Sequence, residues 1–243
     1  MSTLKKVLLG LLIFVGSIAI VIAILAFSFV QAMKGDPDEE EKVRKQAEQY
    51  VREHFEAGTA TVYDAFYDNM GNFDFEYAAG VYNEKYGTDF LVYFDEETEQ
   101  MTDTFISDKW RDDAEKAIQP YINERLGESL TLKDMEPIID SDDWDEIEAF
   151  MKGKIELSVI FDDKIGKKFG VDLNNPVSYM EAGASPDIII VTIPRKKQAD
   201  DEEIFNDIIR ALQEDGIIKH GNIRFEYYDM GVPLEEENWE RSF

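Results

Sequence analysis

The densest group of side chains that could bind a metal ion is the acidic run from Asp140 to Glu146. A calcium EF-hand loop needs oxygen ligands at alternate positions, a glycine at its sixth position and a glutamate at its twelfth. Counted from Asp140, those two positions hold Asp145 and Met151. The run therefore does not match a calcium loop. Acids in the first turn of a helix are favoured by the helix dipole, so we interpret the run as a helix start, with loose cation binding as the alternative.

The two histidines, His54 and His220, are too few for a histidine-rich zinc site. His54 falls on the predicted buried face of a helix, where a lone histidine is usually a hydrogen-bonded core residue, and His220 falls in a turn beside a glycine. The sequence has no HExxH motif, and a mixed site of one histidine and carboxylates stays an alternative. Residues 166–168 lack the upstream glycine of a phosphate-binding loop, and no serine lies in a Gly-x-Ser-x-Gly elbow. We therefore assign no catalytic, cofactor-binding or metal-binding residue.

Charge restricts the classes of partner more than any motif does. The chain carries 52 acidic and 25 basic residues, a net charge of −27, and three of the bases precede residue 35. No acid precedes Asp36, so residues 35–243 carry a net charge of −30. Such a surface repels nucleic acid and anionic lipid head groups, which disfavours both as partners. Because there are no cysteines, thiol nucleophiles, disulfides and thiolate metal sites are excluded.

Residues 7–30 form an uncharged apolar run of 24 residues. As a helix this run would be roughly 36 Å long, which spans a bilayer, whereas the apolar part of a signal peptide has about 7–15 residues. The bases before it, Lys5 and Lys6, place residues 1–6 in the cytoplasm by the positive-inside rule. We therefore predict a transmembrane helix at 7–30 with the C-terminal domain outside. Cleavage near Ala32 is the alternative.

Residues 37–127 are predicted to form an acidic α+β module with an antiparallel sheet. Asp36 as N-cap and Pro37 in the first turn favour a helix of about 16–18 residues with one buried face. Alternating apolar and polar residues then predict strands. The strands are expected at 60–68, 73–82, 88–95 and 101–106.

A second helix of this module is expected from Ser107, as its N-cap, to a stop at Gly127. Pro120 should kink or interrupt this helix because it has no N–H to donate. The apolar residues of the helix recur on one face. They are Trp110, Ala114, Ala117, Ile118, Tyr121, Ile122 and Leu126.

Residues 128–243 are predicted to form a second α+β module or an extension of the same sheet. The order of elements expected there is a connector, a short helix capped by Ser141, a strand, a loop at 163–185, a strand, a helix at 201–215 and a last strand. The stretch "PDIIIVTIP" is apolar on both faces, which is typical of a central strand covered on each side.

The stretch at 91–127 resembles a group of small membrane-anchored or exported proteins of Gram-positive, Bacillus-like bacteria. These proteins share an N-terminal apolar segment, a Y-x-K-Y-G-like stretch, here residues 83–87, and a Trp-x-x-x-Ala-x-x-x-Ile-x-Pro pattern. In this chain the pattern falls on Trp110, Ala114, Ile118 and Pro120. The resemblance covers roughly residues 1–127. It implies a location and a module shape, and no activity.

Together these observations predict a single-pass membrane protein of the bacterial cell envelope with an acidic extracytoplasmic domain. We expect a non-enzymatic binding or accessory module whose partners are the lipid bilayer, through residues 7–30, and an envelope protein or a cationic partner. Nucleic acid is not expected as a partner, and no cofactor is expected. One alternative is an extracytoplasmic carboxylate-dependent hydrolase, for which a pocket with two close acids of raised pKa would be the sign. The other is an acidic cation-binding domain.

Overall fold

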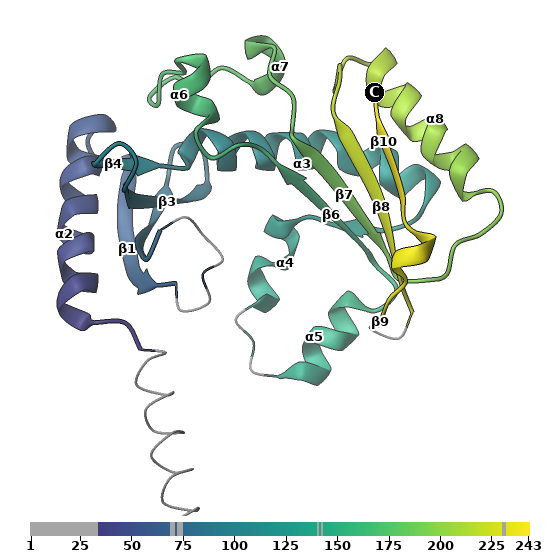
Figure 1. Cartoon of the computed structure of the whole chain (residues 1–243), viewed down its shortest axis with the longest axis horizontal. Coiled ribbons are helices and arrows are strands. Elements are labelled where there is room, and N and C mark those ends of the chain that lie inside the picture. Colours follow the sequence, from purple (N-terminus) through teal and green to yellow (C-terminus); the bar gives the residue numbers. More distant parts are fainter. Residues whose placement is uncertain (1–33, 69–70, 72–74, 140, 142, 230–231) are drawn as a thin grey trace, which may run out of the picture. The chain divides into compact units, whose positions relative to one another are not determined.

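The computed structural model describes residues 34–68, 71, 75–139, 141, 143–229 and 232–243 (Figure 1). The helices are α2 (Pro37–His54), α3 (Phe105–Arg125), α4 (Leu132–Ile139), α5 (Trp144–Met151), α6 (Ile165–Phe169), α7 (Tyr179–Ala182), α8 (Asp201–Glu214) and the 3₁₀ helix η1 (Glu235–Glu237). The strands are β1 (Ala60–Tyr67), β2 (Tyr77–Asn83), β3 (Thr88–Asp95), β4 (Gln100–Asp103), β5 (Ser129–Leu130), β6 (Ile155–Ile160), β7 (Ile188–Ile193), β8 (Asn222–Asp229), β9 (Val232–Pro233) and β10 (Trp239–Ser242).

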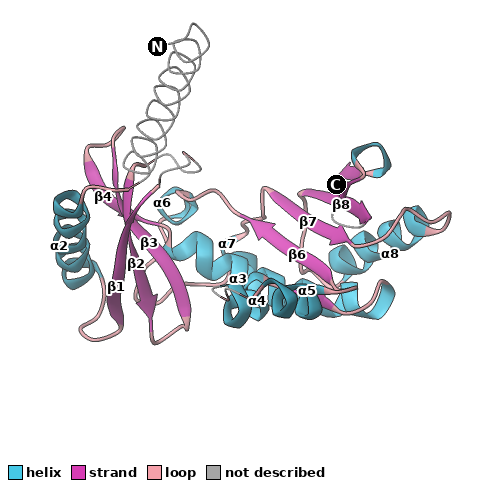
Figure 2. Cartoon of the chain, turned by 90° about the horizontal axis from the view of Figure 1, so that it is seen from below, coloured by secondary structure: helices cyan, strands magenta, loops and turns pink. Residues whose placement is uncertain are grey.

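The predicted α+β class is confirmed (Figure 2). One sheet is antiparallel and has the strand order β1-β2-β3-β4, and the other is mixed and has the order β10-β8-β7-β6-β5, with β9 paired to β8. The predicted transmembrane segment, residues 7–30, lies outside the described residues. Among those that are described, no helix has the length and apolar character needed to cross a bilayer.

The chain divides into two compact units. The smaller contains the described residues of 34–50, 62–80 and 92–102, and the larger contains 51–61, 81–91 and 103–243. The expected boundary at residue 127 falls inside the larger unit.

The helix predicted after Asp36 is confirmed as α2. The Asp36 carboxylate accepts a hydrogen bond from the Asp38 amide at 2.9 Å, as an N-cap does. Val43 and Ala47 are buried on the predicted face. The prediction for His54 was wrong, because this last residue of α2 is exposed.

Helix α3 begins three residues before the sequence predicts, because Thr104 rather than Ser107 precedes its first turn. The Ser107 hydroxyl instead donates to the Thr104 carbonyl oxygen at 2.7 Å. Pro120 does not interrupt the helix, which runs on to Arg125, and its ring lies on the exposed side. The face predicted to be apolar is confirmed by residues with no exposed surface. They are Trp110, Ala114, Ile118 and Ile122.

The mixed sheet corrects the expectation of antiparallel strands throughout. β6 and β7 are antiparallel, but β7 and β8 are parallel, with Ile189 opposite Ile223. The 14-residue helix α8 connects these two strands in the sequence. It carries the chain back to the end of the sheet at which β7 begins, because two parallel strands must start at the same end. Two other predictions were wrong as well. The expected connector after residue 128 contains β5 and α4, and the expected loop at 163–185 contains α6 and α7.

The inner face of this sheet is the side on which Leu157, Val191 and Phe225 lie, and all three are buried. Helix α8 packs there, with the Phe205 ring stacked on the Phe225 ring at a centroid distance of 3.7 Å. Helix α3 also packs against β6 and β5 on this side. The inner face is thus the core of the larger unit.

A buried ion pair fixes the loop between β7 and α8. The Asp201 side chain has no exposed surface, and both of its oxygens accept hydrogen bonds from the Arg195 guanidinium at 2.7 Å. The Tyr227 hydroxyl also donates to Asp201 at 2.7 Å. Burial alone would raise the pKa of Asp201, but these donors hold it below its usual value.

Candidate functional site

The outer face of the mixed sheet, opposite α3 and α8, is incompletely covered. β7 was predicted to be covered on both sides, but its side chains alternate between buried and partly exposed, so that prediction was wrong. β7 is nevertheless central in the sheet, with β6 and β8 as neighbours. On β6 the outward residue Ile160 is 44% exposed. The outer face of β6 and β7 therefore exposes apolar side chains that a partner could cover.

Helix α5 contains apolar residues but buries none of them. Trp144 is 79% exposed. The helix is capped by Asp143, whose carboxylate accepts from the Asp145 amide at 3.0 Å, so Ser141 is not the cap as predicted. Helices this short are marginal in water without tertiary packing. Ile147, Phe150 and Met151 are only partly buried and Trp144 projects into solvent, so this eight-residue helix is a candidate contact surface.

A groove of about 900 Å³ lies between the C-terminal end of α5 and the outer face of the sheet. We call it the α5 groove. One side comes from α5 and the turn after it, and the floor comes from three neighbouring strands or their ends. Its lining residues are Glu148, Met151, Lys152, Gly153, Lys154, Glu156, Thr192, Pro194 and Tyr228.

The charges in the α5 groove are not balanced against one another. Lys154 pairs with the Glu128 carboxylate at 3.2 Å, and its ammonium lies 4.5 Å from the centre of the Phe150 ring. Glu156, on the floor, has no ion pair or side-chain hydrogen bond with any residue that the structure describes. Desolvation raises the pKa of Glu156, and no neighbouring cation opposes that rise. The floor thus carries a solvent-exposed acid with a raised pKa and without a counter-charge.

A second concave site, which we call the α3 cavity, has a volume of about 390 Å³ and also belongs to the larger unit. Most of its lining is polar. The lining residues are Tyr86, Thr88, Asp112, Asp113, Glu115, Lys116, Gln119, Thr131, Lys133 and Asp134.

Glu115 is the most deeply buried acid of the α3 cavity, with 1% of its surface exposed. Its two oxygens accept hydrogen bonds from the backbone amides of Val159, at 3.2 Å, and Leu132, at 3.3 Å. Strand β5 pairs with β6 only as far as Glu156, so it offers no backbone carbonyl to the Val159 amide further along β6. The Glu115 carboxylate accepts the hydrogen bond from that amide instead. Burial raises the pKa of Glu115 to about 7.

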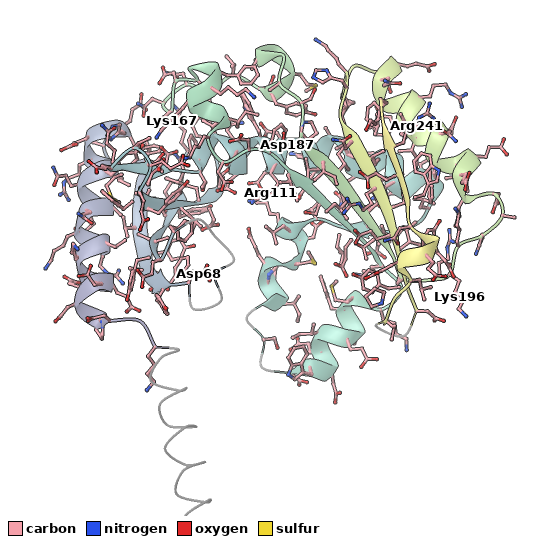
Figure 3. All side chains as sticks on the ribbon, in the orientation of Figure 1. Asp68, Arg111, Lys167, Asp187, Lys196 and Arg241 are labelled. Carbon is pink, nitrogen blue, oxygen red and sulfur yellow. The ribbon has the colours of Figure 1, made fainter. Side chains whose placement is uncertain are left out.

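Arg111 of α3, which Figure 3 labels, forms ion pairs with two more acids of this helix. It donates to Asp108 at 2.6 Å and to Asp112 at 3.2 Å. The Thr104 hydroxyl donates to the second oxygen of Asp108 at 2.5 Å, and Thr88 donates to Asp112 at 3.3 Å. Burial raises the pKa of Asp108 to about 6 and also raises that of Asp112. Raised pKa values are typical of general acids and bases, but each of these carboxyl groups already has donors from the protein.

The residues that the sequence analysis singled out are not brought together. Asp143 caps α5, while residues 140 and 142 lie outside the described part of the chain. His220 is exposed, and its Nδ1 lies 3.5 Å from the Ser185 hydroxyl oxygen. Within the described ranges, no three histidine or acidic side chains are grouped so that they could hold a metal ion.

Sequence reasoning missed the acids of α3 and the acid on the floor of the α5 groove. Asp108, Arg111, Asp112 and Glu115 follow one another at spacings of three, one and three residues, which places them along one side of a helix. That spacing was available as a signal beside the apolar stripe. Glu156 gave no comparable signal, since it stands at an ordinary polar position of an alternating strand.

Comparison of the chain with protein-family models, with curated proteins and with solved structures gives no match. The resemblance of residues 1–127 to Gram-positive membrane-anchored proteins therefore stays a prediction. The function has to be argued from the two concave sites and the surface around them.

Proposed function

We propose that this protein is a non-enzymatic binding module of the bacterial cell envelope, anchored by residues 7–30, and that its partner binds in the α5 groove. The α5 groove itself carries the proposal. It combines a concavity of about 900 Å³ with an amphipathic helix that buries no residue. Clefts of this size with a mixed apolar and polar lining are where proteins hold ligands.

The exposure of apolar side chains on the elements that border the groove supports binding rather than catalysis. Trp144, at the start of α5, and Ile160, at the end of β6, both remain in contact with solvent, although neither lines the groove itself. Tryptophan is enriched among the residues that contribute most to protein interfaces. Covering such groups with a partner would stabilise both α5 and the complex.

The anchor supports the location, and the charge supports the type of partner. A run of 24 uncharged residues preceded by two lysines is typical of a membrane span with its N-terminus in the cytoplasm. The net charge of −30 on residues 35–243 favours partners with basic surfaces, because opposite charges accelerate and orient association.

Site-specific photo-crosslinking of the full-length protein in intact cells tests the proposal. A photoreactive residue in place of Met151 probes the groove, and one in place of the exposed Met180 on α7 is the matched control. We expect one defined adduct from position 151, lost when Trp144→Ala is added, and none from position 180. Equal labelling from both positions, or no adduct at position 151, would contradict the proposal.

A second candidate function, a carboxylate-dependent hydrolase, is supported by the α3 cavity. Asp112 and Glu115 both line this cavity, and burial raises the pKa of each. The test is turnover of cell-wall or peptide substrates by the full chain and by Asp112→Asn. Turnover that is lost in this variant would favour the hydrolase, and no turnover by the wild type would remove it.

A further inference from the structure

We infer that the α5 groove takes an extended polypeptide segment in which a basic side chain lies among apolar ones, and that Glu156 selects the basic side chain. This inference rests on the proposed function and names the chemistry of the partner. It is argued from the dimensions of the groove, from its unpaired charge and from its apolar lining.

The dimensions favour an extended segment over a helix. A helix with side chains is about 10–12 Å wide, so a volume of about 900 Å³ holds only about 8 Å of it, less than two turns. An extended chain occupies about 4.8 by 10 Å in cross-section, so the same volume holds about 19 Å, or five to six residues. Short helices form unfavourably in water, whereas an extended segment has no such nucleation cost.

The unpaired acid on the floor favours a basic side chain in that segment. Neither groove lysine neutralises Glu156: Lys154 pairs with Glu128, and Lys152 is exposed and makes no ion pair within the described residues. Glu148, on the α5 side, likewise has no ion pair in the described part of the chain. Glu156 is exposed, but it lies on the floor of a groove, where low-dielectric walls strengthen the attraction of a charge for a cation relative to an open surface.

The other outward acids of the same sheet already have partners. Glu226 and Glu240 both lie near Arg224, at 3.6 Å and 3.0 Å. Glu156 is separated from that pair by Thr192 of the intervening strand, which lies opposite both Glu156 and Glu226. On this face, the acid without a counter-charge among the described residues, Glu156, therefore lies in the α5 groove.

The remaining lining suits apolar neighbours of the basic side chain. Met151 is flexible and polarisable, which lets it adapt to different apolar shapes. Pro194 and Tyr228 add rigid apolar surface at the ends of β7 and β8. An extended segment places neighbouring side chains on alternate sides, so one side chain can contact the acid on the floor while the next contacts Met151 on the α5 side.

Binding of synthetic hexapeptides to the full-length protein in nanodiscs tests the inference. The probes are dye-labelled hexapeptides of alternating valine and threonine with lysine, norleucine or glutamate at one central position, followed by fluorescence anisotropy. We expect the lysine peptide to bind about tenfold more tightly than the norleucine peptide and more weakly as salt is added. The glutamate peptide should bind weakest.

Glu156→Gln should reduce the affinity for the lysine peptide about tenfold and leave that for the norleucine peptide unchanged. Glu203→Gln, at an exposed position of α8, changes the net charge equally and should change neither affinity. Equal binding of the three peptides by the wild type would overturn the inference while the proposed function stands. If no peptide binds but the Met151 crosslink forms in cells, the inference also fails and the function stands; if both are absent, both fail.

Discussion

Replacing Glu115 with glutamine should remove a loss of stability that this group causes in the wild type between pH 5 and pH 8. Burial raises the pKa of Glu115 to about 7, against 4.5 for the unperturbed group. The folded state therefore binds this proton more tightly than the unfolded state. Stability rises as the pH falls from above 7 to 4.5, and the ionised group weakens the fold at high pH.

The size of the effect follows from that pKa difference. One pKa unit corresponds to about 1.4 kcal/mol, so a shift from 4.5 to about 7 predicts about 2.5 kcal/mol less stability at pH 8 than at pH 5 from this group. Both carboxyl oxygens of Glu115 accept hydrogen bonds from backbone amides, those of Val159 and Leu132, whereas a glutamine side chain has one acceptor oxygen. The variant therefore leaves one amide without its acceptor at every pH, but it has no group that titrates. Relative to the wild type, its free energy of unfolding should rise by about 2.5 kcal/mol from pH 5 to pH 8.

Urea unfolding of the full-length protein in detergent micelles, followed by tryptophan fluorescence at pH 5, 6, 7 and 8, measures this difference. Trp110 is fully buried on the same helix and reports the transition. Glu203→Gln, at an exposed position of α8, controls for the change of net charge. The reasoning is refuted if Glu115→Gln lowers stability equally at pH 5 and pH 8, or if the control shows the same pH-dependent gain.

Three further predictions concern the stability of the fold. Trp144→Ala should change the free energy of unfolding by less than about 0.5 kcal/mol in urea titrations, because the side chain is 79% exposed; a loss above about 1 kcal/mol would show that α5 is packed in solution. Gly166→Ala should destabilise by about 1–3 kcal/mol in the same titrations, because a Cβ there would lie 2.8 Å from Cβ of buried Ile106; an unchanged midpoint would contradict this contact. Asp201→Asn should cost about 3–5 kcal/mol by thermal unfolding, because it leaves the half-buried Arg195 without its carboxylate; a cost below about 1 kcal/mol would argue against the buried pair.

Local signals in the sequence predict much of the secondary structure. The cap at Asp36 sets the start of α2, and the alternation over 88–95 and 222–229 gives β3 and β8 within a residue. These elements depend on their own residues and on one covered face, so their periodicity is sufficient. The stop of α8 before Gly216 is of the same kind, because that glycine adopts a φ of 70°.

Features that depend on tertiary contacts were missed. The two-residue strand β5 forms because its backbone pairs with the edge of β6, and two residues are too few to show a periodic pattern. Pro120 is tolerated because its ring lies on the exposed side of α3. The role of Glu115 depends on how far β5 extends along β6. Glu156 lacks an ion pair because Lys154 pairs with Glu128 instead. Neighbouring residues in the sequence indicate neither of these contacts.

The order of strands in the mixed sheet determines how long β7 lacks its second neighbouring strand during synthesis of the chain. β7, with the sequence Ile-Ile-Ile-Val-Thr-Ile, obtains its β8 neighbour only when residues 222–229 have emerged, 36 residues after β7 ends. At synthesis rates of about 5–20 residues per second, this interval is about 2–7 s. During that time one of the most apolar edges of the nascent chain is open to aggregation, so a chain truncated before β8 should need a chaperone to remain in solution.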